Sequence, residues 1–371
     1  MARIVVAMSG GVDSAVAAWR LRSAGHEVIG LFMRTGVTAP EPQAPAASKQ
    51  GCCSAQDSRD ARRVADVLDI PFYALDFAAE FERIIDHFAA EHLRGRTPNA
   101  CVLCNAWLKF GKLWTCARAL GADGIATGHY AQVRSGPGGP ELHRAVDSAK
   151  DQSYFLFGIQ QEMLARLHLP LGSLTKPEVR QLAAAAGLPV AHKPDSVSLC
   201  FLPDGDVAGL VERRRPGAAT PGPILDRAGV QVGTHSGLPG VTVGQRKGLG
   251  VAGPARRFVL ELLPQQNAIV LGTRAEALVP DLIAEGCHWL TNELPAEVLT
   301  KFSYREAAVP GRLGFRDAGT VRVRFESPQF GVAPGQAVVF YAGSRVLGGG
   351  WIGKEQPARL GARVGADVAS G

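Results

Sequence analysis

The sequence predicts an α/β fold in which a doubly wound parallel sheet comes first and smaller β-rich domains follow. Apolar strand-like runs alternate with helix-like segments up to about residue 130, as is typical of parallel sheets. After about residue 206 the chain becomes rich in Gly, Pro and Val, with short β-like runs between frequent turns. A chain of 371 residues also exceeds one ordinary core.

The domain boundaries follow from where this pattern changes. We expect a parallel-sheet domain over 1–205, a small central domain over 206–276 and a C-terminal β-barrel over 277–358. The stretch 359–371 has no apolar periodicity, and we expect a disordered tail there.

Each element of the parallel sheet has its own signal in the sequence. Short apolar runs predict strands at Ile4–Met8, Val28–Met33, Phe72–Leu75 and Gly124–Thr127. Segments with apolar residues at helical spacing predict helices at Ser14–Ala24, Asp57–Leu68, Phe77–His92 and Ala106–Leu120. Ligands of such sheets bind beyond the carboxyl ends of the strands, so the residues that follow these strands should converge on one crevice.

The later elements are predicted from turn chemistry. The loop Thr35–Gln56, rich in Pro, Ala and Gln, is expected to be mobile. A helix should begin at Thr175, because Pro177 suits a first turn and Glu178 an N-terminal end, and should stop at Gly187. Further strands are predicted at Val259–Leu263, Ala268–Leu271, Thr320–Phe325 and Ala337–Tyr341.

Composition narrows the class of protein. No run of about 18 apolar residues could span a bilayer. The first residues lead straight into a strand without a signal-peptide pattern, so we expect a cytoplasmic protein. A net charge of +6 suits a polyanionic partner such as RNA, although a genome that favours Arg would give the same value. Seven cysteines argue against a disulfide framework in such a chain and favour reactive or metal-binding thiols.

The hexapeptide SGGVDS at 9–14 predicts a nucleotide phosphate site. Two glycines after a strand let the backbone turn tightly and direct several N–H groups to one point, and the following helix adds its positive dipole end. Asp13 can hold Mg²⁺ or orient the loop. The loop lacks Lys and the Walker A spacing. An ordinary glycine-rich turn is the alternative for a lone SGG, and the full hexapeptide in this context argues against it.

Two thiols are candidates for chemistry. Cys104 closes a C-x-x-C pair just before the helix predicted to include Lys109, and a thiol at a helix N-terminus has a lowered pKa. Cys200 lies where a polar loop turns apolar. The alternative for each thiol is a small buried hydrophobe, which we assign to Cys116 and Cys287.

These features together resemble the bacterial tRNA-specific 2-thiouridylases, members of the ATP pyrophosphatase (PP-loop) family, over nearly the whole chain to about residue 353. The shared motifs are SGGVDS (9–14), TPN through CN and KF (97–110), ATGHYA (126–131), DQSYFL (151–156), DS through CF (195–201), GQRKGLG (244–250) and VLGGG (346–350). Seven motifs in family order make an accidental match implausible. The resemblance implies an ATP pyrophosphatase domain followed by a central domain that contacts tRNA and a C-terminal barrel.

The resemblance also implies a mechanism. The C2 oxygen of the wobble uridine attacks the α-phosphate of ATP, and Cys200, loaded as a persulfide, then delivers sulfur while Cys104 acts as the nucleophile that leaves a Cys104–Cys200 disulfide. Asp13 joins these two as a catalytic residue, and Mg²⁺ accompanies ATP. The implied ATP-binding residues are Ala7, Met8, Ser9, Gly10, Gly11, Val12, Asp13, Ser14, Met33 and Gly128.

The resemblance further implies partners. The tRNA-binding residues would be Asn99, Ala100, Cys101, His129, Lys150, Asp151, Gln152, Tyr304 and Gln336. His129 taken alone is more often a structural histidine. The family's Arg-Tyr contact pair stands here as Ser303-Tyr304, which puts that contact in doubt. We expect tRNAs for Lys, Glu and Gln as acceptors, a cysteine desulfurase or another sulfur-relay protein as donor, a monomer and no membrane.

One departure from the family opens another route. Cys101 stands where relatives often carry Asp, so Cys101, Cys104 and Cys200 could hold a [4Fe-4S] cluster with one open iron site, and hydrosulfide on iron would then be the donor. We favour the persulfide route over this iron-sulfur route. Two other functions are alternatives: an ATP pyrophosphatase ligase that adenylates a small molecule, and a non-catalytic RNA-binding protein.

Overall fold

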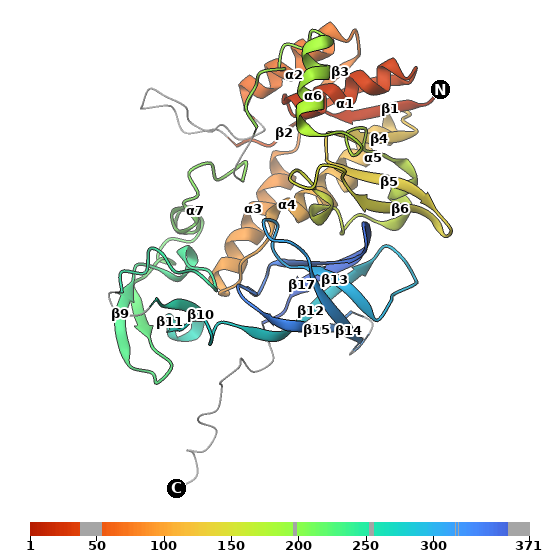
Figure 1. The fold of residues 1–371 in the computed structure, drawn as a ribbon. Coiled ribbons are helices and arrows are strands. Elements are labelled where there is room, and N and C mark those ends of the chain that lie inside the picture. Colours follow the sequence, from red (N-terminus) through yellow and green to blue (C-terminus); the bar gives the residue numbers. More distant parts are fainter. Residues whose placement is uncertain (38–53, 196–198, 252–255, 316, 318, 355–371) are drawn as a thin grey trace.

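The computed structural model describes residues 1–37, 54–195, 199–251, 256–315, 317 and 319–354 (Figure 1). Most of the loop expected to be mobile at 35–56 lies outside the described residues, as do Cys52, Cys53 and the tail expected at 359–371. None of the helices that the structure describes is long and apolar enough to cross a membrane.

The first domain is built on a parallel sheet with the strand order β3-β2-β1-β4-β7, which confirms the predicted fold class. Its strands are β1 (Arg3–Ala7), β2 (Glu27–Arg34), β3 (Phe72–Asp76), β4 (Gly124–Thr127) and β7 (Leu167–His168). The order changes direction between β1 and β4, and the crevice beyond the carboxyl ends of these two strands is where such sheets bind ligands.

Helices cover both faces of this sheet. Side chains of β1 alternate between two cores: Ile4 and Val6 pack into the cluster formed with α1 and α6, and Val5 packs into the cluster formed with α3. The helices are α1 (Val12–Ser23), α2 (Ala55–Val67), α3 (Ala78–Leu93), α4 (Ala100–Leu103), the π-helix η1 (Cys104–Lys112), α5 (Leu113–Ala119) and α6 (Lys176–Ala185), with the 3₁₀ turns η2 (Ser153–Phe155) and η3 (Gln161–Arg166).

The helix predicted at Ala106–Leu120 begins earlier, at Ala100. The Asn99 side chain accepts a hydrogen bond from the Val102 backbone N–H at 3.4 Å and caps a continuous run of α4, η1 and α5. The thiol expected just before this helix, Cys104, therefore lies one turn inside it, at the junction of α4 and η1. Cys101, not Cys104, is the cysteine in the first turn of this helix.

The central domain follows α7 (Val207–Arg214) and has its own small core around Ile224, Val259 and Ile269. Its strands pair in the order β10-β11-β8-β9. They are β8 (Gly222–Leu225), β9 (Gln231–His235), β10 (Phe258–Leu263) and β11 (Ala268–Gly272), with the 3₁₀ turns η4 (Leu238–Gly240) and η5 (Pro264–Gln266).

The C-terminal domain is a closed β-barrel, as predicted. Strands follow the order β12-β15-β14-β13-β16-β17, and β12 also pairs with β17 to close the ring. The strands are β12 (Val279–Trp289), β13 (Glu297–Lys301), β14 (Val309–Phe315), β15 (Val321–Gln329), β16 (Ala337–Ala342) and β17 (Arg345–Ile352).

A hairpin of the first domain extends the sheet of the barrel. Strands β5 (Ala131–Gly136) and β6 (Gly139–Arg144) pair with each other, and β6 pairs with β17 through His143 and Arg345. The two domains also share one hydrophobic core, in which Tyr154 and Phe157 pack with Val339 and Tyr341 of β16. The first domain and the barrel are therefore joined by continuous structure, and Figure 1 shows β5 and β6 beside the barrel.

Candidate active site

The hexapeptide at 9–14 forms the turn from β1 into α1, at the carboxyl edge of the sheet. The Ser9 backbone N–H donates to Ser14 Oγ at 3.1 Å, and Ser14 Oγ donates to the Gly11 carbonyl at 3.1 Å. Gly10 has a φ of +73°, and a Cβ there would lie 2.2 Å from the Asp57 carbonyl oxygen. Only glycine fits this position, because both the left-handed backbone and the close approach of α2 exclude a side chain.

The other predicted ATP-binding residues surround this turn. Gly128 follows β4, and a Cβ there would lie 2.7 Å from the Ser14 nitrogen, so the backbones of the two segments nearly touch. Met8 and Val12 are buried in the core, and the Met8 backbone N–H donates to the Leu31 carbonyl at 2.8 Å. Ala7 ends β1 and Met33 lies near the end of β2, at the same edge of the sheet.

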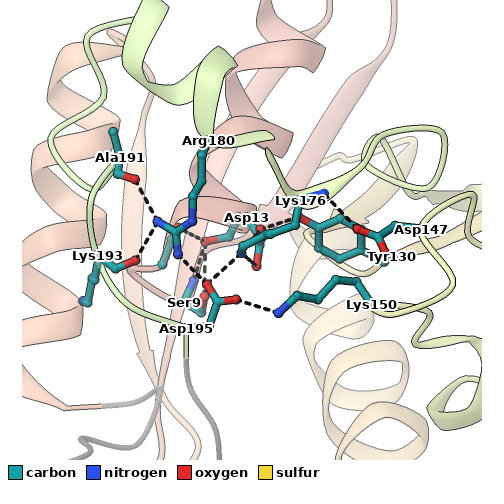
Figure 2. A network of polar contacts seen from close by, with 12 residues as sticks. Ser9, Asp13, Tyr130, Asp147, Lys150, Lys176, Arg180, Ala191, Lys193 and Asp195 are labelled. Carbon is teal, nitrogen blue, oxygen red and sulfur yellow. Dashed lines mark hydrogen bonds and ion pairs between the residues drawn. The ribbon is translucent and has the colours of Figure 1, made fainter. Parts of the chain in front are cut away.

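Asp13 sits in the first turn of α1 and is held by two residues from elsewhere in the chain. Lys176, the first residue of α6, contacts Asp13 Oδ1 at 2.7 Å and Oδ2 at 2.8 Å. The Tyr130 hydroxyl donates to Asp13 Oδ1 at 2.8 Å. Burial and the nearby Asp13 raise the pKa of Tyr130, so its phenol stays protonated and able to donate. Figure 2 shows Lys176 and Tyr130 converging on Asp13.

A second carboxylate, Asp195, links this cluster to neighbouring cations. It contacts Lys176 at 2.9 Å, Lys150 at 2.8 Å and Arg180 at 2.8 Å (Figure 2). Partial burial by itself would raise the pKa of Asp195, but hydrogen bonds from Lys150 and Lys176 outweigh it and lower the pKa to about 2. The carboxylate therefore stays charged near neutral pH and anchors three cationic side chains beside the phosphate turn.

Lys193 fixes the turn from its other side. Its ammonium donates to the Gly10 carbonyl at 2.9 Å, to Asp57 at 2.7 Å and to Asp60 at 2.6 Å. Asp57 is buried and also forms the capping box of α2 with Ser54. The backbone of the turn is thus tied to the start of α2.

The two predicted reactive thiols lie half-buried against one hydrophobic core. Cys104 stands at the junction of α4 and η1, and Cys200 precedes Phe201. The Phe201 ring packs edge-on against Phe81 and Phe88 of α3, with centroids 5.9 and 5.3 Å away. Helix α3 therefore supports the segment that carries Cys200.

Several predicted tRNA-binding residues meet where the first domain touches the barrel. Tyr304 is 37% exposed, and its ring lies 4.5 Å from that of Phe155. Burial, Asp151 and, more weakly, Cys101 raise the pKa of the Tyr304 phenol, which places both residues near it. Asn99 caps α4, and its side chain acts against the rise in the pKa of the Tyr154 phenol that burial causes. Ala100 is buried, so its side chain is not available to a ligand.

Gln336 lies in a turn that abuts the Arg96–Asn99 segment. The Thr97 backbone N–H donates to the Pro334 carbonyl at 2.7 Å, and a Cβ on Gly335 would lie 2.9 Å from the Thr97 nitrogen. The barrel thus brings Gln336 to the same junction as Asn99.

Three other predicted tRNA-binding residues direct their polar groups inward. Buried Asp151 accepts hydrogen bonds from the Ala145 and Ser153 backbone N–H groups. Gln152 accepts one from the Tyr130 N–H at 3.0 Å. Buried His129 hydrogen-bonds to Thr127 at 2.7 Å, and its desolvation lowers its pKa well below the usual value, so it is neutral. Lys150 remains partly exposed, with its ammonium on Asp195.

The two expected metal sites, an iron-sulfur cluster and Mg²⁺, have different outcomes. Among the described residues, which include Cys101, Cys104 and Cys200, no three His, Cys, Asp or Glu side chains are grouped so that they could hold a metal ion. The described residues therefore give no support to the [4Fe-4S] cluster suggested by the sequence. Mg²⁺ in nucleotide sites needs only one or two carboxylates besides phosphate oxygens, and Asp13 fits that requirement.

The polar network around the turn was missed by sequence reasoning. Lys176 and Lys193 were not singled out in the sequence, and Tyr130 and Asp195 were included only within the shared motifs. One signal pointed to such a network: a phosphate turn without any Lys or Arg needs cations from other segments.

A phosphate-binding turn at the edge of a doubly wound sheet, joined to a barrel that shares its core, defines a nucleotide-binding enzyme of the HUP class. Residues 2–204 match the family model described as "tRNA methyl transferase HUP domain". Residues 211–273 match its PRC-barrel domain, and residues 279–352 match an aminomethyltransferase β-barrel domain.

Curated relatives identify the family more narrowly. The tRNA-specific 2-thiouridylase MnmA of Rhodopirellula baltica is 45% identical, and the match covers 95% of this chain and 96% of the relative. The protein of the same name from Geobacter metallireducens is 48% identical, with 94% and 96% covered. The chain belongs to the tRNA-specific 2-thiouridylase family. A solved 4-thiouridine synthetase–RNA complex with bound ATP has a TM-score of 0.35 at 15% identity, over 57% of this chain and 53% of that one, which is too distant to carry an argument.

Proposed function

We propose that this chain is a tRNA-uridine 2-sulfurtransferase that uses ATP to convert the wobble uridine of tRNA into 2-thiouridine. The observation that carries the proposal is identity of 45–48% with curated 2-thiouridylases over at least 94% of this chain, which includes the phosphate turn and both candidate thiols. This match over all three domains disfavours a small-molecule ligase and a non-catalytic RNA-binding protein.

The proposed reaction begins at the phosphate turn. N–H groups of the turn at 9–14 and the N-terminus of α1 hold the phosphates of ATP. The uridine C2 oxygen attacks the α-phosphate, the bond to pyrophosphate breaks, and the base becomes O-adenylated. Asp13 would hold Mg²⁺, which supplies charge neutralisation for the phosphates. The carbonyl oxygen has then become a good leaving group.

Sulfur transfer follows at the two thiols. The terminal sulfur of a Cys200 persulfide attacks C2, and AMP leaves. The Cys104 thiolate then attacks the Cys200 sulfur, which breaks the S–S bond to the base and leaves 2-thiouridine and a Cys104–Cys200 disulfide. A dithiol reductant supplies two electrons to restore both thiols. Their positions on one core, at the α4–η1 junction and beside α3, support this division of roles.

The junction of the first domain and the barrel is proposed to receive the target base. Exposed Tyr304, whose ring packs at a tilt against that of Phe155, offers an aromatic surface near Asn99 and Cys101. Partial exposure of Lys150 supports a contact with a tRNA phosphate, whereas the inward bonds of Asp151, Gln152 and His129 favour positioning roles. The Gln336 turn completes this surface.

The partners follow from this chemistry. We propose tRNAs for Lys, Glu and Gln as acceptors and a cysteine desulfurase or another sulfur-relay protein as the source of the Cys200 persulfide. A monomer suffices, and the cytoplasm is the expected location because these substrates are found there.

A reconstituted thiolation assay tests the proposal. Unmodified tRNA is incubated with ATP, Mg²⁺ and cysteine plus a cysteine desulfurase, and digested nucleosides are analysed by mass spectrometry. We expect 2-thiouridine from the wild type and from the control Cys116→Ser. We expect product to fall at least about 100-fold in Cys104→Ser and Cys200→Ser, because each removes an obligatory sulfur.

A second readout separates the two half-reactions. Pyrophosphate release that depends on tRNA should persist in Cys200→Ser, because adenylation comes before sulfur transfer. Full thiolation by both cysteine variants would contradict the proposal.

A further inference from the structure

The helical run from α4 through α5 begins with two cysteines three residues apart. Cys101 lies in the first turn, and Cys104 stands where α4 passes into η1, with helical backbone angles (φ −58°, ψ −43°). Residues three apart on a helix lie on the same face, with their Cα atoms about 5 Å from each other. A disulfide can bridge this separation after a small local adjustment. The two thiols are therefore a pair that can exchange with one another.

The burial pattern shows that this pair lies on the less buried face of the helix. Val102 and Leu103, the residues between the two cysteines, are 2% and 6% exposed and belong to the core of the first domain. Cys101 and Cys104 are only half-buried, and Trp107, three residues further on, is 47% exposed. The cysteine face therefore points away from the core.

The position of Cys101 at the start of the helix suits it to attack. Asn99 caps the first turn, and the positive end of the helix dipole favours the thiolate form of a cysteine there. Cys104 lies one turn further in, where this effect fades. Besides burial and Asp151, Cys101 raises the pKa of the Tyr304 phenol, so Cys101 also lies near the surface proposed to receive the target base.

The disulfide left by the proposed sulfur transfer must be opened before Cys200 can be loaded again. Both of its sulfurs belong to half-buried residues that pack on the core of the first domain, which restricts the approach of another protein. A thiol on the same helix, one turn before Cys104, needs no diffusion. Effective concentrations for well-oriented groups in one molecule reach about 10⁵–10⁸ M. Cys101 therefore has a large advantage over an external thiol.

We propose that Cys101 is the resolving thiol of this enzyme. Its thiolate attacks Cys104 Sγ, the bond between Cys104 and Cys200 breaks, and Cys200 leaves as a thiolate that takes up a proton. A Cys101–Cys104 disulfide forms, so the protein neither gains nor loses electrons in this exchange. A dithiol protein of the thioredoxin class then reduces that disulfide, and its own two thiols are oxidised. The inference rests on the proposed function and adds a step at the same site.

Disulfide mapping after one turnover tests this inference. Wild type and Cys101→Ser are loaded with persulfide by a cysteine desulfurase, freed of cysteine, and mixed with tRNA, ATP and Mg²⁺ without reductant. Acid stops the reaction, and thiols are blocked before digestion with trypsin. Cys101 and Cys104 fall in one peptide, 97–109, so their disulfide closes a loop, whereas a bond to Cys200 links two peptides. We expect mainly the loop in wild type and only the linked peptides in Cys101→Ser.

Repeated turnover gives a second readout. With a thioredoxin-class dithiol present, the rate of later turnovers is divided by the amount of 2-thiouridine made in the first. This ratio should fall at least about tenfold in Cys101→Ser, because the intramolecular attack is lost. A weaker contact with tRNA affects both quantities and cancels in the ratio. Cys116→Ser, on the same helical run, is the matched control and should behave as the wild type does.

Two results would overturn the inference. One is a wild type that holds only the Cys104–Cys200 bond after one turnover; the other is a Cys101→Ser variant whose ratio stays within about threefold of wild type. The wild-type map needs no variant, so the inference can fail even if Cys101→Ser does not fold. Formation of 2-thiouridine with neither disulfide, or no 2-thiouridine at all, would count against the proposed function instead.

Discussion

At Gly10 the absence of a single side-chain carbon allows the phosphate turn and α2 to meet. The turn needs a left-handed residue, and the Asp57 carbonyl lies where a Cβ would be placed. Lys193 links the same two residues, because it donates to the Gly10 carbonyl and to the Asp57 side chain. A residue that binds no ligand by its side chain thus fixes the geometry of those that do.

Gly10→Ala should lower the free energy of unfolding by about 2–5 kcal/mol, through left-handed strain and the clash with α2. ATP affinity should fall at least about tenfold, because the N–H groups of the turn move. The control is Gly25→Ala, where φ is +84° and an added Cβ meets nothing within 4 Å, so backbone strain of about 1–2 kcal/mol acts alone. Equal effects of the two substitutions on unfolding and ATP binding would contradict the close-contact argument.

At the scale of elements, helix α3 supports the candidate site and also carries a buried histidine that makes the stability of the fold depend on pH. Its buried face supports Phe201, next to Cys200, and its last turn buries His92 beside Phe88. Burial lowers the pKa of His92 to about 4, although Glu91 acts in the opposite direction. In the unfolded chain the pKa of a histidine is near 6.5. His92 is therefore harder to protonate in the folded protein than in the unfolded chain.

Between pH 6.5 and about 4 the unfolded chain holds more protons at His92 than the folded protein does, so stability falls as the pH falls through this window. The loss from this residue should be about 3 kcal/mol across the window. Urea unfolding at about pH 7 and about pH 4.5 should show a smaller loss for His92→Leu than for wild type. His87→Leu, on the same helix at a half-buried position, is the control and should behave as the wild type does. An unchanged pH dependence in His92→Leu would refute this assignment.

At the scale of the whole molecule, the first domain is completed by the barrel. One hydrophobic core includes Val5 of β1 and Val339 of β16, and the Tyr154 hydroxyl donates to the Ala337 carbonyl at 2.8 Å. Glu141 of the hairpin pairs with Arg345 of β17 at 3.1 Å. The candidate base-binding surface around Tyr304 lies at this shared boundary.

A chain that ends at residue 276 should therefore lose cooperative unfolding and aggregate, because it exposes Tyr154, Phe157 and the edge of β6. A chain that ends at residue 354 is the control, since it keeps every strand of the barrel that the structure describes. Thermal melting and size-exclusion chromatography compare the two. A monomeric 1–276 fragment with a single sharp transition would contradict the shared-core argument.

The sequence predicted best those features that depend on neighbours along the chain. Each predicted strand of the parallel sheet is observed, because an apolar run between turns is a local signal. The start of α4 was missed, because its only local sign is the Asn99 cap. The hairpin of β5 and β6 was missed too, because its pairing to the barrel depends on a distant strand.

In the candidate site, too, the sequence predicted features formed by neighbouring residues and missed those formed by distant ones. The turn at 9–14 could be recognised, because its glycines and helix start are adjacent in sequence. The contact between Asp13 and Lys176 spans 163 residues, and no spacing rule connects two charged residues at that separation. The inward orientation of Asp151 and Gln152 was equally hidden, since a motif gives a residue type but not the direction of its side chain.

The pairing of β6 with β17 has a consequence for synthesis on the ribosome. His143 meets Ser344 across 201 residues, so the edge of the hairpin is made long before its partner. At roughly 5–20 residues per second, this delay lasts on the order of 10–40 seconds. During that time the nascent chain presents an open sheet edge and an unfilled core to solvent. Completion of the barrel is therefore the event that ends the exposure of the newly made enzyme to aggregation.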